Sequence, residues 1–213
     1  MRAFLIDFGH LLLGLNFILY AIGFFKNGKS YKIFTVYLFL IIVVELTSSI
    51  LLKLHEPNLF MSHFYFIGQF ILLSLFYLNL TKDEFQKKTI KIGFILVLLT
   101  LAIQYGLKSD LFFKFNLYEI FITSFLLIIY SVFHFYNMLD DKKEFYYINM
   151  GILLYLFAST ILFLIGNLTA KFSKDFSMIT WTINAILVVV YHLFFLYEWK
   201  VNYFKREKAQ ITD

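Results

Sequence analysis

Seven long apolar segments, separated by short polar connections, constrain this chain more than any other feature. A helix that crosses a bilayer needs roughly 20 apolar residues, so the 213 residues allow seven crossings and little else. Backbone polar groups inside a bilayer must be satisfied within the segment, which predicts a helix for each span. The expected spans cover about 4–25, 33–52, 60–80, 92–107, 117–138, 148–168 and 179–199. We therefore expect an all-α polytopic membrane protein: one seven-transmembrane-helix bundle over 1–199 and a short basic cytoplasmic tail over 200–213.

The composition excludes most other classes of protein. Hydrophobic residues make up 61% of the chain and charged residues 15%, against about 45–50% and 25% in soluble domains. The net charge of +5 would suggest nucleic acid in a soluble protein, but no Lys or Arg lies inside a span. We expect no nucleic-acid partner. The chain has no cysteine, which excludes disulfides, zinc–thiolate sites and Fe–S clusters.

The basic residues predict the orientation of the chain in the membrane. The first, third and fifth connections and the tail hold 13 Lys and Arg, and the N-terminus and the other connections hold 6. Basic connections stay in the cytoplasm, which predicts an outer N-terminus and a cytoplasmic C-terminus in the inner (cytoplasmic) membrane. The tail is too short for an output domain, so a signalling role would need a cytoplasmic partner.

The fifth span carries a polar stripe along one helical face. Its residues recur at steps of three and four, which places them on one side of a helix. They are Asn116, Glu119, Thr123, Leu127, Tyr130, His134 and Asn137. Such a stripe suits a pore, a proton relay or the wall of a ligand cavity, and equally well a set of helix–helix hydrogen bonds.

Glu45 is the carboxylate deepest inside a span. No Lys or Arg lies at that depth, so we expect it to be protonated or paired with a histidine or an amide. With the N-terminus outside, His10, Gln69 and Asn184 lie at a comparable depth. We expect these four residues to form a polar cup open to the outside, with His63, Gln104 and Glu119 nearer its rim.

Two further spans carry polar landmarks. In the sixth span Tyr155, Ser159 and Gly166 share a face, where small residues allow close packing or a cavity. In the third span His63 and Gln69 point in different directions by helical geometry, so at least one of them is structural or at the rim. The many tyrosines near span ends, Tyr105 among them, are expected to form an interfacial belt.

The sequence predicts no metal and no cofactor. Histidine and carboxylate suit zinc or iron, but no closely spaced ligand pair occurs. A haem between His134 and His192 is conceivable, yet lone histidines in spans usually pack and hydrogen-bond. The last span has no lysine for a retinal Schiff base.

The C-terminal third carries a pattern of polar landmarks: the run 149–155, Asn167 and the run 181–187, together with the spans around Glu45 and Tyr65/Gln69. With this pattern the chain resembles a family of small, uncharacterised seven-helix membrane proteins common in Bacteroidota. The resemblance implies a seven-helix fold and an inner-membrane location, and it adds no catalytic residue.

Four functions remain open, in this order of preference. The first is a seven-helix sensor that binds a small ligand in the outer cup and signals through a partner. The second is a small-molecule or ion transporter using Glu45, Glu119 and His134; against it stands the lack of paired helix breaks, with Pro only at 57. A pore or accessory subunit follows, and an intramembrane lipid-acting enzyme comes last. The ligand candidates are therefore Glu45, His10, Gln69, Asn184, Glu119, Tyr130, His134 and Ser159, and the oligomeric state stays open.

Overall fold

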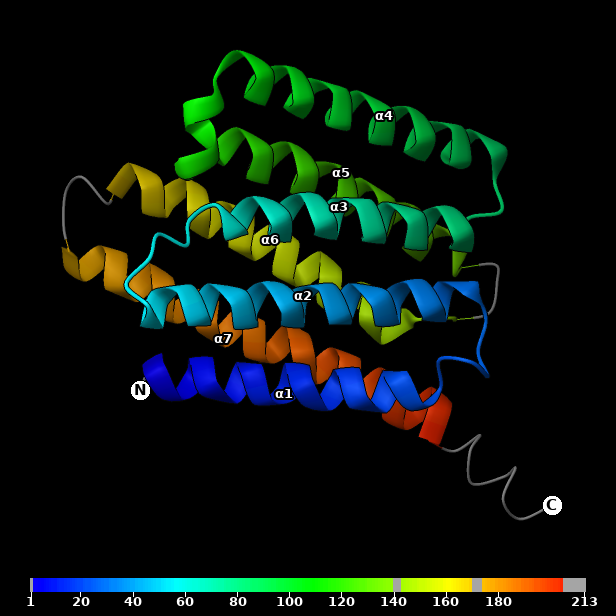
Figure 1. Ribbon diagram of the computed structural model, residues 1–213. Coiled ribbons are helices and arrows are strands. Elements are labelled where there is room, and N and C mark those ends of the chain that lie inside the picture. Colours follow the sequence, from blue (N-terminus) through cyan, green and yellow to red (C-terminus); the bar gives the residue numbers. More distant parts are fainter. Residues whose placement is uncertain (1, 140–142, 170–173, 205–213) are drawn as a thin grey trace. The chain divides into compact units, whose positions relative to one another are not determined.

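The computed structural model describes residues 2–139, 143–169 and 174–204, and this part of the chain is helical (Figure 1). All seven expected helices are present and each is long and apolar enough to cross a bilayer, which confirms the expected all-α class with seven candidate membrane-spanning helices and fits a multi-pass membrane protein. They are α1 (Arg2–Ile22), α2 (Lys29–Lys53), α3 (Met61–Leu80), α4 (Glu84–Leu107), α5 (Leu117–Asn137), α6 (Tyr146–Thr169) and α7 (Lys174–Trp199). A 3₁₀ turn, η1 (Ser109–Phe113), joins α4 to α5, and a π turn, η2 (Lys200–Phe204), follows α7.

The largest difference from the expected boundaries lies in the fourth span. The apolar segment of the sequence begins near residue 92, but α4 begins eight residues earlier, at Glu84. The side chain of Asp83 accepts a hydrogen bond from the backbone N–H of Gln86 at 2.8 Å, which is an N-cap. Lys87, Lys88 and Lys91 then lie in polar helical turns that hydropathy alone assigns to a connection. The expectation that the fourth span forms the shortest helix is therefore wrong, because α4 has 24 residues.

The helices fall into two compact units. One comprises residues 24–134, with α2, α3, α4 and all but the end of α5. In it α3 lies between α2 and α4 (Figure 1). Large apolar side chains such as Phe34, Phe70 and Phe76 are completely buried there. In this unit α2 ends, α3 begins, α4 ends and α5 begins at the same end, because short connections join antiparallel neighbours.

The other unit comprises residues 1–23 and 135–213 and contains α1, α6 and α7. Here α7 lies between α1 and α6. Two side chains of α1 bind the α7 backbone: Asn16 donates to the carbonyl of His192 at 2.9 Å, and the Tyr20 hydroxyl donates to that of Phe195 at 3.0 Å. The contact of α6 with α7 is close because position 151 is glycine; an added Cβ there would come within 2.9 Å of the Cβ of Phe194.

Two helix ends have unusual solutions. α2 ends in a Schellman motif: the N–H of Glu56 donates to the carbonyl of Leu51 at 2.9 Å, and His55 has a positive φ of 60°. α6 begins with no polar residue of its own at the cap. The fully buried carboxylate of Glu198, from α7, accepts from the backbone N–H of Tyr147 at 2.8 Å instead. Negative charge at a helix N-terminus is stabilising.

Two expectations fall partly outside the described residues. The fifth connection includes 140–142, and the tail expected from residue 200 continues beyond Phe204. The described start of that tail is η2, in which Asn202 donates to Glu198 at 2.5 Å.

Candidate functional site

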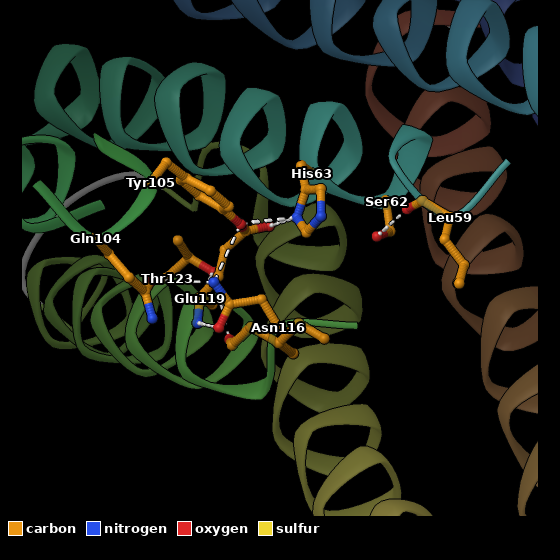
Figure 2. A network of polar contacts seen from close by, with 9 residues as sticks. Leu59, Ser62, His63, Gln104, Tyr105, Asn116, Glu119 and Thr123 are labelled. Atoms are coloured by element: carbon orange, nitrogen blue, oxygen red, sulfur yellow. Dashed lines mark hydrogen bonds and ion pairs between the residues drawn. The ribbon is translucent and has the colours of Figure 1, made fainter. Parts of the chain in front are cut away.

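A cluster of buried polar side chains joins α3, α4 and α5 at one end of the unit formed by residues 24–134. Glu119 and His63 are 0% and 2% exposed. The Nδ1 atom of His63 lies 3.0 and 3.2 Å from the two carboxylate oxygens of Glu119. The Tyr105 hydroxyl donates to Glu119 and lies 2.9 Å from the same Nδ1 atom. Figure 2 shows the three side chains converging from three different helices.

The start of α5 positions the carboxylate. Asn116 is the N-cap residue, and its Oδ1 atom accepts from the backbone N–H of Glu119 at 3.3 Å. Its Nδ2 atom donates to Gln104 at 2.9 Å and to the Tyr105 hydroxyl at 3.1 Å, which ties the end of α4 to the start of α5. Glu119 is the third residue of α5, where the helix dipole favours an ionised carboxylate.

Aromatic rings surround the histidine. The ring of Phe112, from η1, stacks on that of His63 with centroids 5.4 Å apart, and Tyr105 meets the same ring edge-on at 5.3 Å. The rings of Phe60, just before α3, and Phe64, in its first turn, also contact Phe112. The polar cluster is thus covered by apolar groups, which strengthens its internal electrostatic interactions.

One nitrogen of this cluster is left without a partner. The Nε2 atom of His63 is buried and makes no hydrogen bond. The backbone carbonyls of Phe112 and Lys114 interact with the ring but do not reach hydrogen-bonding geometry with Nε2. Buried polar atoms without a partner are rare and costly, so this atom is the first place to look for a ligand.

The segment that covers the cluster is otherwise exposed. The exposed pair Lys114–Asp110 closes η1 at 2.6 Å. The Lys114 ammonium lowers the pKa of Asp110. Because both groups face solvent, the pair adds little stability.

The polar stripe of α5 faces the interior, as its spacing predicts. Thr123, Leu127, Tyr130 and His134 are all at most 5% exposed. Thr123 donates to its own helix at the carbonyl of Glu119, 2.7 Å away. Leu127 is apolar and fills the middle of the stripe. Along the stripe Leu127 thus lies between the cluster at Glu119 and the pair Tyr130 and His134.

Tyr130 and His134 make different contacts. The Tyr130 hydroxyl donates weakly to the carbonyl of Ile90 in α4, at 3.4 Å. Gly93 makes that approach possible, since a Cβ there would overlap the hydroxyl. The His134 ring lies 6.2 Å from that of Tyr77 in α3.

Two residues expected in the cup lie in the same unit but serve other contacts. Gln69 is 2% exposed and donates to the Tyr37 hydroxyl at 2.8 Å, linking α3 to α2. His63 and Gln69 thus point to different neighbours, as helical geometry predicts. Glu45 is half-buried in α2.

The remaining cup residues belong to the unit of α1, α6 and α7. His10 is exposed on α1 and interacts electrostatically with His192. Asn184 is half-buried, and its Oδ1 atom has no hydrogen-bond partner. Ser159 is buried and donates to its own helix at the carbonyl of Leu156, 3.4 Å away. The cup draws on both units and stays a prediction.

The sequence predicts Glu119 as a ligand candidate, but not its partners. It predicts His63 and Gln104 near the rim with Glu119, and Tyr105 in the interfacial belt. The available signal was Asn116-x-x-Glu119, a capping pattern whose carboxylate turns away from its own helix. Among the described residues no three His, Asp or Glu side chains gather as metal ligands.

Comparisons with protein-family models, with curated proteins and with solved structures found no match.

Proposed function

We propose that the protein is a seven-helix membrane sensor in which the cluster of His63, Tyr105 and Glu119 receives a small ligand. The observation that carries the proposal is the unpartnered Nε2 atom of His63 inside a cluster that joins three helices. A ligand at this atom acts on α3, α4 and α5 together. A ligand shifts an equilibrium only by its differential affinity for two arrangements of the protein. His63 lies on α3 and contacts residues of α4 and α5, so an arrangement that changes these contacts also changes the affinity at Nε2.

The ligand is proposed to arrive from outside the cell. The cluster lies where α3 and α5 begin and α4 ends. With the orientation predicted from the basic residues, this end of the unit faces outward. The inner (cytoplasmic) membrane location rests on the same charge bias and on the resemblance to the Bacteroidota family. The cytoplasmic end would then present the basic connections to a signalling partner.

The helices favour a sensor over the alternative of a transporter. Transporter sites are commonly built on discontinuous helices, whereas α3, α4 and α5 run unbroken through their described lengths. The apolar side chain of Leu127 lies between the two polar parts of the stripe on α5. A continuous relay for protons or ions would need polar groups or water there.

Spin-label distances test the coupling that a sensor requires. Because the chain has no cysteine, a pair of labels on Lys29→Cys and Lys88→Cys reports the opposite end of the same unit. We expect the distance distribution in lipid nanodiscs to shift in His63→Gln and in Glu119→Gln. The control His55→Gln removes an exposed histidine at the cluster's own end and should leave it unchanged.

An unchanged distribution in both cluster variants, with normal folding, would mean that the cluster is a static clasp. The sensor proposal would then be wrong.

A further inference from the structure

The protonation of the His63–Glu119 pair determines whether the Nε2 atom of His63 donates or accepts a hydrogen bond. Among the described residues no Lys or Arg touches Glu119, and a net charge in so buried a place is unfavourable. Two neutral arrangements place every hydrogen of the pair: a His63 imidazolium beside a Glu119 carboxylate, and a neutral His63 whose Nδ1 atom accepts from a protonated Glu119. A neutral His63 protonated at Nδ1 beside a protonated Glu119 would leave the carboxyl hydrogen without an acceptor, because the Tyr105 hydroxyl already donates to that carboxylate. In both allowed arrangements Nε2 carries a hydrogen and is a donor.

The contacts of Tyr105 agree with this count. Its hydroxyl hydrogen goes to Glu119, and its oxygen accepts from Asn116. The Tyr105 hydroxyl therefore has no hydrogen left for Nδ1. The proton between Nδ1 and the carboxylate belongs to the His63–Glu119 pair itself. The start of α5 stabilises the carboxylate form further.

The surroundings of Nε2 add two more requirements. The carbonyls of Phe112 and Lys114 interact with the ring, and a group that bridges from Nε2 to one of them must both accept and donate. Apolar rings are the other neighbours of the imidazole: Phe112 stacks on it, and Phe60 and Phe64 contact Phe112. An anion is disfavoured because Glu119 already neutralises the imidazolium, and a cation would oppose the N–H.

We infer that this site takes a neutral, largely apolar molecule through a hydroxyl group, which accepts from His63 Nε2 and donates to a backbone carbonyl of Phe112 or Lys114. This inference rests on the proposed function and names the chemical class of its ligand. A lipid hydroxyl, such as that of diacylglycerol, and a free alcohol share the required chemistry.

Nitrogen NMR of the histidines tests the donor. The chain has five histidines, so protein labelled with ¹⁵N-histidine in phosphatidylcholine nanodiscs gives few signals, and His63→Gln assigns the one of interest. We expect an N–H signal at Nε2 of His63 at neutral pH, retained in the control His55→Gln. A bare, unprotonated Nε2 would overturn the inference.

Four matched probes then test the ligand class: 2-phenylethanol, phenylacetate, phenethylamine and ethylbenzene. They share an aromatic body and differ in one group. We expect 2-phenylethanol to shift the Nε2 signal and to bind at least about tenfold more tightly than the other three. Equal or tighter binding of any of those three, or no shift with any hydroxyl compound, would overturn the inference.

Diacylglycerol added to the nanodiscs separates the two sources. A shift with diacylglycerol alone supports a lipid hydroxyl, and a shift with 2-phenylethanol alone supports a free alcohol. A second variant, Phe112→Leu, keeps the pair His63–Glu119 intact and should change probe affinity without changing the Nε2 proton. Failure of the spin-label test with success here would leave a binding site that does not signal, so the two proposals can fail separately.

Discussion

At the scale of single residues, the cluster shows how a buried histidine–carboxylate pair is held in a membrane protein. Removing one partner of such a pair leaves an uncompensated polar group, which is much worse than removing both. Glu119 is completely buried and receives contacts from His63 and Tyr105. Its substitution should therefore be felt as a loss of stability as well as of function.

Glu119→Gln is expected to destabilise the protein by about 3 kcal/mol, because the amide keeps the shape but not the charge that balances His63. Thermal unfolding in detergent measures the loss. Glu56→Gln, an exposed carboxylate at the same end, should change stability by less than about 0.5 kcal/mol. In the double variant with His63→Gln the second substitution should cost less than it does alone; strict additivity would contradict the pairing.

Gly93→Ala is expected to destabilise by about 1–2 kcal/mol, since the new methyl group overlaps the Tyr130 hydroxyl and overpacks a buried site. Gly106→Ala on the same helix is the matched control, because its Cβ meets open space. That control should be neutral or stabilising, as alanine is the better helix former. Unfolding midpoints for both variants check the contrast, and equal effects would refute the assigned contact.

At the scale of elements, some helix ends are completed by their own sequence and the start of α6 by a neighbouring helix. α4 and α5 carry their own caps, Asp83 and Asn116. α6 instead uses the Glu198 side chain of α7. The start of α6 is therefore stable only when α7 is in place, which makes these two helices one cooperative piece of structure.

His55→Gly is expected to stabilise the end of α2 by about 0.5–1 kcal/mol. The Schellman motif holds residue 55 at a φ of 60°, where a Cβ atom is strained and glycine is not. Thermal unfolding measures the gain, with His55→Ala as the comparison that keeps the Cβ. A gain in the alanine variant as large as in the glycine variant would show that strain is not the cause.

At the scale of the whole molecule, the seven helices must alternate in direction, so the orientation of one connection determines all the others. The charge bias predicts η1 outside and the connection between α1 and α2 inside. The absence of native cysteine makes this directly measurable.

Ser109→Cys is expected to react in intact cells with a membrane-impermeant maleimide. Gly28→Cys should react only after the membrane is permeabilised. Both positions are exposed, so reactivity reports the side of the membrane rather than burial. The reverse pattern would invert the orientation and place the cluster of His63 and Glu119 at the cytoplasmic face.

What the sequence determined by itself follows from the bilayer. Apolar length dictates seven helices, and periodicity dictates that the stripe residues of α5 face inward, because both are properties of one helix in a bilayer. The caps of α4 and α5 are equally local. Hydropathy predicts the start of α4 too late, near residue 92. The first turns of this helix are charged, and hydropathy does not detect a helix outside the apolar layer of the membrane.

The tertiary structure alone decided which polar residues meet. His63, Tyr105 and Glu119 lie on three helices, and their contact depends on how those helices are rotated and on where η1 folds back. Depth placed His63 beside Glu119 without showing that they touch, and the Tyr105 hydroxyl looked like one of many at the interface. Pairing across helices is set by packing of whole surfaces, and no spacing within a single span records it.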